Sequence, residues 1–311
     1  MGIPESQLEV WSNQGAIATA KATHESIRRA LNADTSPLKQ KGLVEGRDRD
    51  FEIYLQGSYK NTTNIRGDSD VDVVVQLNQV FEPETSELSF SEQILLTQTF
   101  LPSLYNWWDW RSDVLGALGA YYGWKNVDDT GNKSLKLKKG SSRLAADIVP
   151  CRQYRHYQHF RSIFEPFVEG IKFYTRQENR PVINYPKLHY ENGAVKNSLN
   201  HTNGWYKPVV RIFKNARSRL VEQGLITKDV APSYFLECLL YNVPNEKFGQ
   251  SYQLSYLQIV LWLMEYIQDA SSSLFLCQNE QMSLFGDTPE QWSIENAKEL
   301  ITALIYLWME W

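Results

Sequence analysis

The chain has 311 residues, of which 42% are hydrophobic and 22% are charged. This composition supports a sizeable core and argues against a disordered chain. No apolar run approaches the roughly 20 residues that a membrane-spanning helix requires, and the net charge of -4 argues against a protein that mainly coats nucleic acid. No charged-then-apolar signal opens the sequence. We therefore expect a globular, cytoplasmic protein with no membrane segment and no strong nucleic-acid-binding signal.

The first part of the chain mixes helical and strand patterns. Apolar residues recur at helical spacing over about 6–31, and short strand patterns follow over 52–56 and 71–77. A helix is expected over about 91–108. The segments 134–140 and 143–150 are expected to form a hairpin, and two more strand patterns cover 170–174 and 181–185.

After Pro186 the pattern becomes almost entirely helical. Helices are expected over about 204–223, 233–241, 254–269 and 293–308. Strands with interspersed helices, followed by a helical region, are typical of an α+β architecture. We expect a cleft between the two lobes, because ligand sites occur preferentially there.

The most informative stretch is GSYKNTTNIRGDSDVDVVV, which begins at Gly57. Side chains alternate between the two faces of a strand, so Asp70 and Asp72 are predicted to share one face while the valines pack on the other. Two carboxylates this close repel each other unless a cation lies between them or water surrounds both. Magnesium suits such a pair because it prefers hard oxygen ligands. The pattern favours a divalent metal site.

A third carboxylate, Asp147, lies in the apolar segment LAADIVP, where a buried and unpaired charge would be costly. Three aspartates on two strands are typical of nucleotidyl transfer with two metals about 3.5–4 Å apart. A corner made of Gly57 and Ser58 would let backbone amides and a hydroxyl approach a triphosphate. Alone, a DxD pattern is more often a turn and an edge strand with solvated aspartates. The combination of the three features indicates catalysis.

The stretch from Gly57, followed by AADIVPC, resembles the nucleotidyltransferase superfamily that includes polymerase β. It is most similar to the cGAS/DncV-like nucleotidyltransferases (CD-NTases) of bacterial anti-phage CBASS systems. Further along the chain, GWYKPVVRIFKNARSRL resembles the spine-associated helix of that family, and APSYFLECLLYNVP resembles the helix that follows it. The resemblance extends from about Gln56 to Pro244.

The resemblance implies a role for seven residues. Three aspartates match the metal ligands, which hold Mg²⁺ or, in its place, Mn²⁺: Asp70, Asp72 and Asp147. Four residues match the contacts to the donor triphosphate: Gly57, Ser58, Lys214 and Ser233. Apart from the resemblance, Lys214 could belong to a basic surface helix, and Ser233 is a good helix N-cap, where free amides favour anions.

The resemblance also implies a fold and an activity. The fold is a polymerase β-like core with a mixed sheet, a long N-terminal helix and a helical C-terminal lobe, with the active site in the cleft between the lobes. The catalytic core would cover 1–185, and the lobe that closes over the nucleotides would cover 186–311. The activity is the synthesis of a cyclic oligonucleotide, most often a dinucleotide, from NTPs with release of pyrophosphate. A downstream effector would sense this antiviral second messenger, and a regulatory protein partner could control the enzyme.

Base selection has only a weak candidate. The segment NGAVKNSLNHTNG is rich in amide side chains, which can donate to and accept from a base edge, and Asn197 is its candidate. Asparagine and glycine also simply form turns. Two other functions stay open: transfer of NMP to an RNA end, small molecule or protein hydroxyl, and nucleotide binding without catalysis. The retained aspartates argue against the last, because clustered carboxylates without a metal would destabilise the fold.

Overall fold

The computed structural model describes residues 2–67, 69–267 and 274–311. The chain divides into two compact units. The sheet unit consists of Ile17–Gln56 and Asp68–Pro186, and the helical unit consists of Met1–Ala16, Gly57–Gly67 and Lys187–Trp311. The helical unit therefore takes in two segments from the first part of the chain. The domain bounds expected from the sequence, 1–185 and 186–311, stay a prediction.

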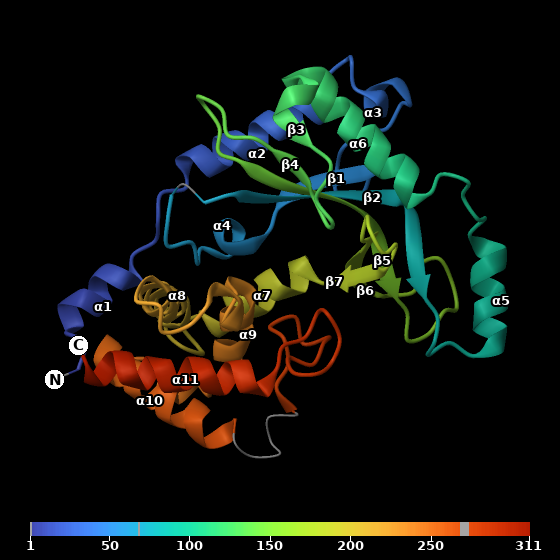
Figure 1. Cartoon of the computed structure of the whole chain (residues 1–311). Coiled ribbons are helices and arrows are strands. Elements are labelled where there is room, and N and C mark those ends of the chain that lie inside the picture. The colour runs from blue at the N-terminus through green and yellow to red at the C-terminus, as the bar shows by residue number, and fades with distance from the viewer. Residues whose placement is uncertain (1, 68, 268–273) are drawn as a thin grey trace. The chain divides into compact units, whose positions relative to one another are not determined.

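The sheet unit is built on one mixed sheet, and the sequence prediction of an α+β fold with such a sheet is confirmed (Figure 1). Five strands lie side by side in the order β1 (Phe51–Leu55), β2 (Val71–Glu84), β5 (Ala146–His156), β4 (Leu135–Leu137) and β3 (Val127–Asp128). β6 (Val168–Tyr174) pairs with β5, and β7 (Pro181–Asn184) pairs with β6. Strands β2 and β5 are parallel, and the other pairs are antiparallel.

Helices cover one side of this sheet. α2 (Ala18–Leu31) and α6 (Trp107–Tyr122) lie on the same side in Figure 1. The indole N–H of Trp107 donates to the carbonyl of Pro150 at 2.8 Å, and that of Trp110 donates to Val75 at 3.1 Å. These bonds fix α6 to the two strands that carry the aspartates. The remaining helices of the unit are α3 (Pro37–Gln40), α5 (Phe90–Thr99) and the 3-10 helix η1 (Trp124–Asn126).

The single helix expected over 91–108 is instead α5 and the start of α6. α5 ends at Thr99, and Pro102 in the connection cannot donate a helical hydrogen bond. α6 then has its own start signal, because the Asn106 side chain accepts from the backbone N–H groups of Trp108 and Asp109. Asn106 is thus a local helix-start signal inside the range expected to be one helix.

The long N-terminal helix expected over 6–31 is also two helices. α1 (Glu5–Ser12) belongs to the helical unit and α2 to the sheet unit. Between them, Gly15 exchanges hydrogen bonds with Asn64 at 3.0 and 2.9 Å. A Cβ at Gly15 would lie 2.7 Å from the carbonyl carbon of Arg66, so only glycine fits this close approach. Contacts distant in sequence interrupt the helical pattern.

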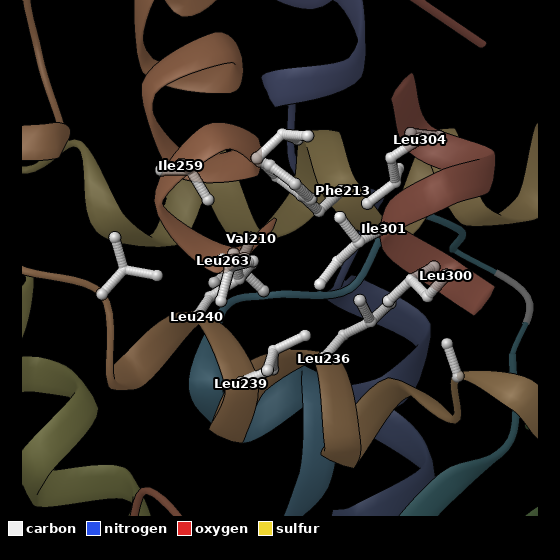
Figure 2. Close-up of a cluster of buried hydrophobic side chains, with 14 of the residues drawn as sticks. Val210, Phe213, Leu236, Leu239, Leu240, Ile259, Leu263, Leu300, Ile301 and Leu304 are labelled. Carbon is white, nitrogen blue, oxygen red and sulfur yellow. The ribbon is translucent and has the colours of Figure 1, made fainter. Parts of the chain in front are cut away.

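The helical unit packs around one apolar core (Figure 2). Its main helices are α7 (Pro186–Lys196), α8 (Tyr206–Glu222), α9 (Ser233–Tyr241), α10 (Tyr252–Tyr266) and α11 (Ile294–Met309). Shorter elements are α4 (Gly57–Asn61), η2 (Lys228–Val230) and η3 (Asn245–Lys247). Figure 2 shows Phe213 of α8, Leu239 of α9 and Leu263 of α10 converging in the core, and each is at most 1% exposed. α9 matches its expected bounds, whereas the end of α10 expected at 269 lies outside the described residues.

Within the part of the chain that the structure describes, no helix is long and apolar enough to cross a membrane.

Candidate active site

Two of the predicted metal ligands lie opposite each other on the paired strands of the sheet unit. Asp72 of β2 and Asp147 of β5 are register partners in the parallel pair. Because register partners lie on the same face of neighbouring strands about 4.8 Å apart, these carboxylates stand side by side. Asp70 precedes β2 by one residue and is exposed, whereas Asp72 and Asp147 are half-buried. All three aspartates therefore lie at the same end of the two strands.

The donor set suits a hard divalent cation. Carboxylate oxygens are the ligands that Mg²⁺ prefers. The hydroxyl of Ser134 donates to Asp147 Oδ1 at 3.0 Å, which orients this carboxylate as groups around a metal ligand commonly do. Among the described residues, no three histidine, cysteine, aspartate or glutamate side chains are already gathered as tightly as a metal ion requires. The fit therefore rests on the type of donor and on the strand register.

The Gly57-Ser58 corner follows directly after β1. β1 ends at Leu55, and Gly57 opens α4 with a φ of +64°, a conformation that glycine adopts without strain. The backbone N–H of Thr63 donates to the carbonyl of Ser58 at 2.9 Å and closes the turn. The residue before the corner, Gln56, donates its N–H to the carbonyl of Asp72 at 3.0 Å. The predicted phosphate corner is thus a strand-to-helix turn that requires its glycine.

Lys214 is not a solvent-facing lysine in this structure. It is 2% exposed, and its ammonium pairs with Glu237 Oε1 at 2.5 Å. It also donates to the carbonyl and the hydroxyl of Thr63, at 3.3 and 3.1 Å. These contacts occupy all three donors of the ammonium. The interpretation of a basic surface helix therefore fails for Lys214.

Glu237 lies at the centre of this buried network, and nothing in the sequence pattern identified it. Its Oε2 accepts from Asn61 Nδ2 at 2.9 Å and contacts His189 Nε2 at 3.0 Å. Burial alone would raise the pKa of Glu237, but the charge of Lys214 and the hydrogen bond to His189 outweigh it and hold the pKa well below its ordinary value. The glutamate is therefore ionised, and it ties α8 and α9 to the segment that follows the Gly57-Ser58 corner.

Ser233 is the exposed first residue of α9 and not its N-cap as the sequence predicts, because Pro232 occupies the N-cap position. The residue before it, Pro232, provides no side-chain cap. The Ser233 hydroxyl accepts from Arg217 Nη2 at 3.2 Å. The cation that contacts Ser233 is therefore Arg217, which sequence reasoning did not select.

Asn197 serves the local backbone. Its side-chain oxygen accepts from the N–H of Lys207 at 2.8 Å, at the start of α8, and its carbonyl accepts from Gly204 at 2.9 Å. The half-buried carboxamide thus has the turn-forming role that asparagine often has. A role in base selection stays a prediction.

The chain is similar to known proteins over its whole length. Residues 191–309 match the family model of the cGAS/DncV-like nucleotidyltransferase C-terminal helical domain. The chain is 51% identical over 311 residues to a cyclic UMP-AMP synthase from Rhodothermus marinus (strain SG0.5JP17-172), covering 100% of this chain and 99% of the relative. It is 42% identical over 313 residues to the cyclic nucleotide synthase CdnE01 from Staphylococcus haemolyticus, covering 100% of both.

A solved structure gives the same result. The Rhodothermus marinus CdnE c-UMP-AMP synthase, solved with Apcpp and Upnpp, superposes with a TM-score of 0.86 at 50% identity. The superposition covers 99% of this chain and 97% of that chain. The similarity therefore includes both units and not only the helical one.

Proposed function

Because this chain belongs to the cGAS/DncV-like nucleotidyltransferases and is a cyclic oligonucleotide synthase, we propose that it joins UTP and ATP into a cyclic dinucleotide with release of pyrophosphate. The observation that carries the proposal of nucleotidyl transfer is the parallel register that sets Asp72 beside Asp147. The choice of bases is supported by the relative named cyclic UMP-AMP synthase, which matches the whole chain.

In this proposal Asp70, Asp72 and Asp147 hold Mg²⁺, or Mn²⁺ in its place. A bound divalent cation would supply charge neutralisation for the phosphates and activation of the attacking hydroxyl. The protein contributes the carboxylates on a rigid strand pair and the Ser134 hydrogen bond that orients Asp147. The half-burial of Asp72 and Asp147 supports this role, because a carboxylate in a less hydrated setting gains more from a cation.

Phosphate binding in this proposal falls to the helical unit. The turn at Gly57 and Ser58 offers backbone amides and a hydroxyl, and Ser233 offers a hydroxyl at an uncapped helix start. We also propose that Lys214 contacts the triphosphate and that Asn197 takes part in base selection. Direct contact between Lys214 and a triphosphate would require its ammonium to leave Glu237.

We further propose that the product is the second messenger of CBASS antiviral signalling, sensed by a downstream effector, with a regulatory protein partner as an additional control. The family resemblance supports this setting. The NTP substrates are supported by the R. marinus neighbour, whose structure contains Apcpp and Upnpp.

The test uses the purified protein with each NTP labelled at the α-phosphate, alone and in pairs, with Mg²⁺ or Mn²⁺. Products are treated with phosphatase and resolved beside those of the Asp70→Ala/Asp72→Ala variant, whose circular dichroism confirms folding. We expect a phosphatase-resistant product that contains label from UTP and from ATP and is lost in the variant. A resistant product with other bases would overturn the base assignment, and label on an added RNA or small acceptor would favour NMP transfer instead.

A further inference from the structure

Arg217 is a buried cation with no role in the proposed reaction. It lies on α8, three residues after Lys214, and is 7% exposed. Its Nη2 donates to the Ser233 hydroxyl at 3.2 Å, whereas its Nε is buried and has no hydrogen-bond partner within the described residues. A buried charged donor without an acceptor costs free energy, so the site favours a ligand that can accept from it.

The start of α9 adds further donors at the same place. α9 has nine residues, and Pro232 at its N-cap offers no side-chain acceptor for the first backbone N–H groups. The amides of the first turn of a helix have no intrahelical partner, and the helix dipole places positive charge there. The Arg217 guanidinium contacts Ser233, the first residue of this helix. The backbone amides and the guanidinium therefore offer hydrogen-bond donors at the same place.

The charge of Arg217 itself is not balanced by a carboxylate among the described residues. Burial, and then the charge of Arg66, lowers the pKa of Arg217. Arg66 is exposed and lies 3.7 Å from Glu222, whereas no carboxylate pairs with Arg217 in the described part of the chain. Lys214 contributes little to this potential, because its charge is balanced by Glu237. The cation without a counter-charge at Ser233 is therefore Arg217.

We propose that Arg217 is a substrate-binding residue, whose guanidinium binds a phosphate beyond the α-phosphate of a bound NTP together with the Ser233 hydroxyl and the first amides of α9. This inference rests on the proposed function and deepens it, since the resemblance to the family assigns no role to Arg217. A guanidinium suits this task because its fixed fork of donors matches two phosphate oxygens at once.

The test compares a triphosphate analogue with a nucleoside monophosphate and with free pyrophosphate. Calorimetry with Mg²⁺ measures the affinity of wild type and Arg217→Gln for α,β-methylene ATP, AMP and inorganic pyrophosphate. We expect Arg217→Gln to bind the triphosphate analogue about 10- to 100-fold more weakly, which corresponds to the loss of charge-assisted hydrogen bonds, and to bind AMP as wild type does. Arg219→Gln is the matched control, because Arg219 is exposed on the same helix, and it should leave all three affinities unchanged.

Arg217→Lys keeps the charge but loses the fork, and it should fall between wild type and Arg217→Gln. It also provides the test if Arg217→Gln does not fold. If a folded Arg217 variant shows the same ratio of triphosphate affinity to AMP affinity as wild type, the inference is overturned. A variant that binds only pyrophosphate more weakly, with unchanged affinity for the triphosphate analogue, would also overturn it, because the site would then bind a free anion and not the phosphates of an NTP.

Failure of the two proposals can be told apart. If wild type makes no cyclic product but Arg217→Gln still loses triphosphate affinity, the inference stands and the proposed product is wrong. If wild type makes the product and the affinities do not change, the inference alone fails.

Discussion

The buried pair of Lys214 and Glu237 allows a stability prediction with a defined size. Lys214 is 2% exposed and Glu237 is 4% exposed. Lys214→Met would leave the glutamate charged and buried with only neutral donors and His189 around it. Breaking a buried ion pair by removing one partner costs about 3–5 kcal/mol. Since a domain is typically stable by about 5–15 kcal/mol, the variant should lose a large part of its free energy of unfolding.

The measurement is urea denaturation followed by circular dichroism at pH 7. Lys228→Met is the matched control, because Lys228 is exposed in the same unit, and it should change stability by no more than about 0.5 kcal/mol. The double variant Lys214→Met/Glu237→Leu should recover part of the loss, because it leaves no unpaired charge. If Lys214→Met behaves like Lys228→Met, the ammonium is not held as the structure shows, and it is free to serve a phosphate.

The same pair predicts a pH dependence. Because the folded pKa of Glu237 lies below its ordinary 4.5, its contribution is fully present above pH 4.5 and is lost as the pH falls below that value. The stability difference between wild type and Glu237→Gln should therefore be constant from pH 6 to 8 and shrink below pH 4.5. A difference that instead changes between pH 6 and 8 would contradict this assignment to the Glu237 carboxylate.

Three further predictions concern single residues. Gly57→Ala and Gly224→Ala both force alanine into the left-handed region, at φ of +64° and +71°, and each should cost about 1–2 kcal/mol on denaturation; only Gly57→Ala should also raise the KM for NTP. Ser134→Ala releases Asp147 and should lower kcat about 10- to 100-fold with little change in melting temperature; an unchanged kcat would exclude this orienting role. Burial lowers the pKa of Lys196 to about 8 from 10.5, so its folding penalty holds below pH 8 and disappears by pH 10.5. Wild type should accordingly gain up to roughly 3 kcal/mol relative to Lys196→Met over that range, and parallel pH curves would contradict the shift.

The sequence predicts the elements whose signals are local. α9 begins and ends at its expected residues because Pro232 and Ser233 mark its start and an apolar run continues it. The alternation around Asp72 predicts β2, and the lone charge in an apolar segment predicts the strand of Asp147. The parallel pairing of those strands is not visible in the sequence, because register depends on where distant segments meet.

The errors have the same physical origin. The N-terminal helix breaks because Gly15 bonds to Asn64, nearly 50 residues away. α7 has no helical periodicity, and its glycine and asparagine indicate a turn; packing in the helical unit overrides that preference. The sequence also does not show that the charge of Lys214 is balanced, because its partner Glu237 lies on another helix. Pattern reading therefore identifies charged residues but not which of them are already neutralised.

That distinction decides which cation on α8 can serve a phosphate. Lys214 and Arg217 are three residues apart on α8, and Ser233 and Glu237 are four apart on α9, so each pair shares one side of its helix. Between the helices, Lys214 meets the carboxylate and Arg217 meets the hydroxyl. A carboxylate cancels the charge of its partner, whereas a hydroxyl orients a guanidinium and leaves its charge intact. The positive charge at the start of α9 therefore belongs to Arg217. Replacing the hydroxyl by a carboxylate with Ser233→Glu should neutralise Arg217 and abolish triphosphate binding while the fold persists.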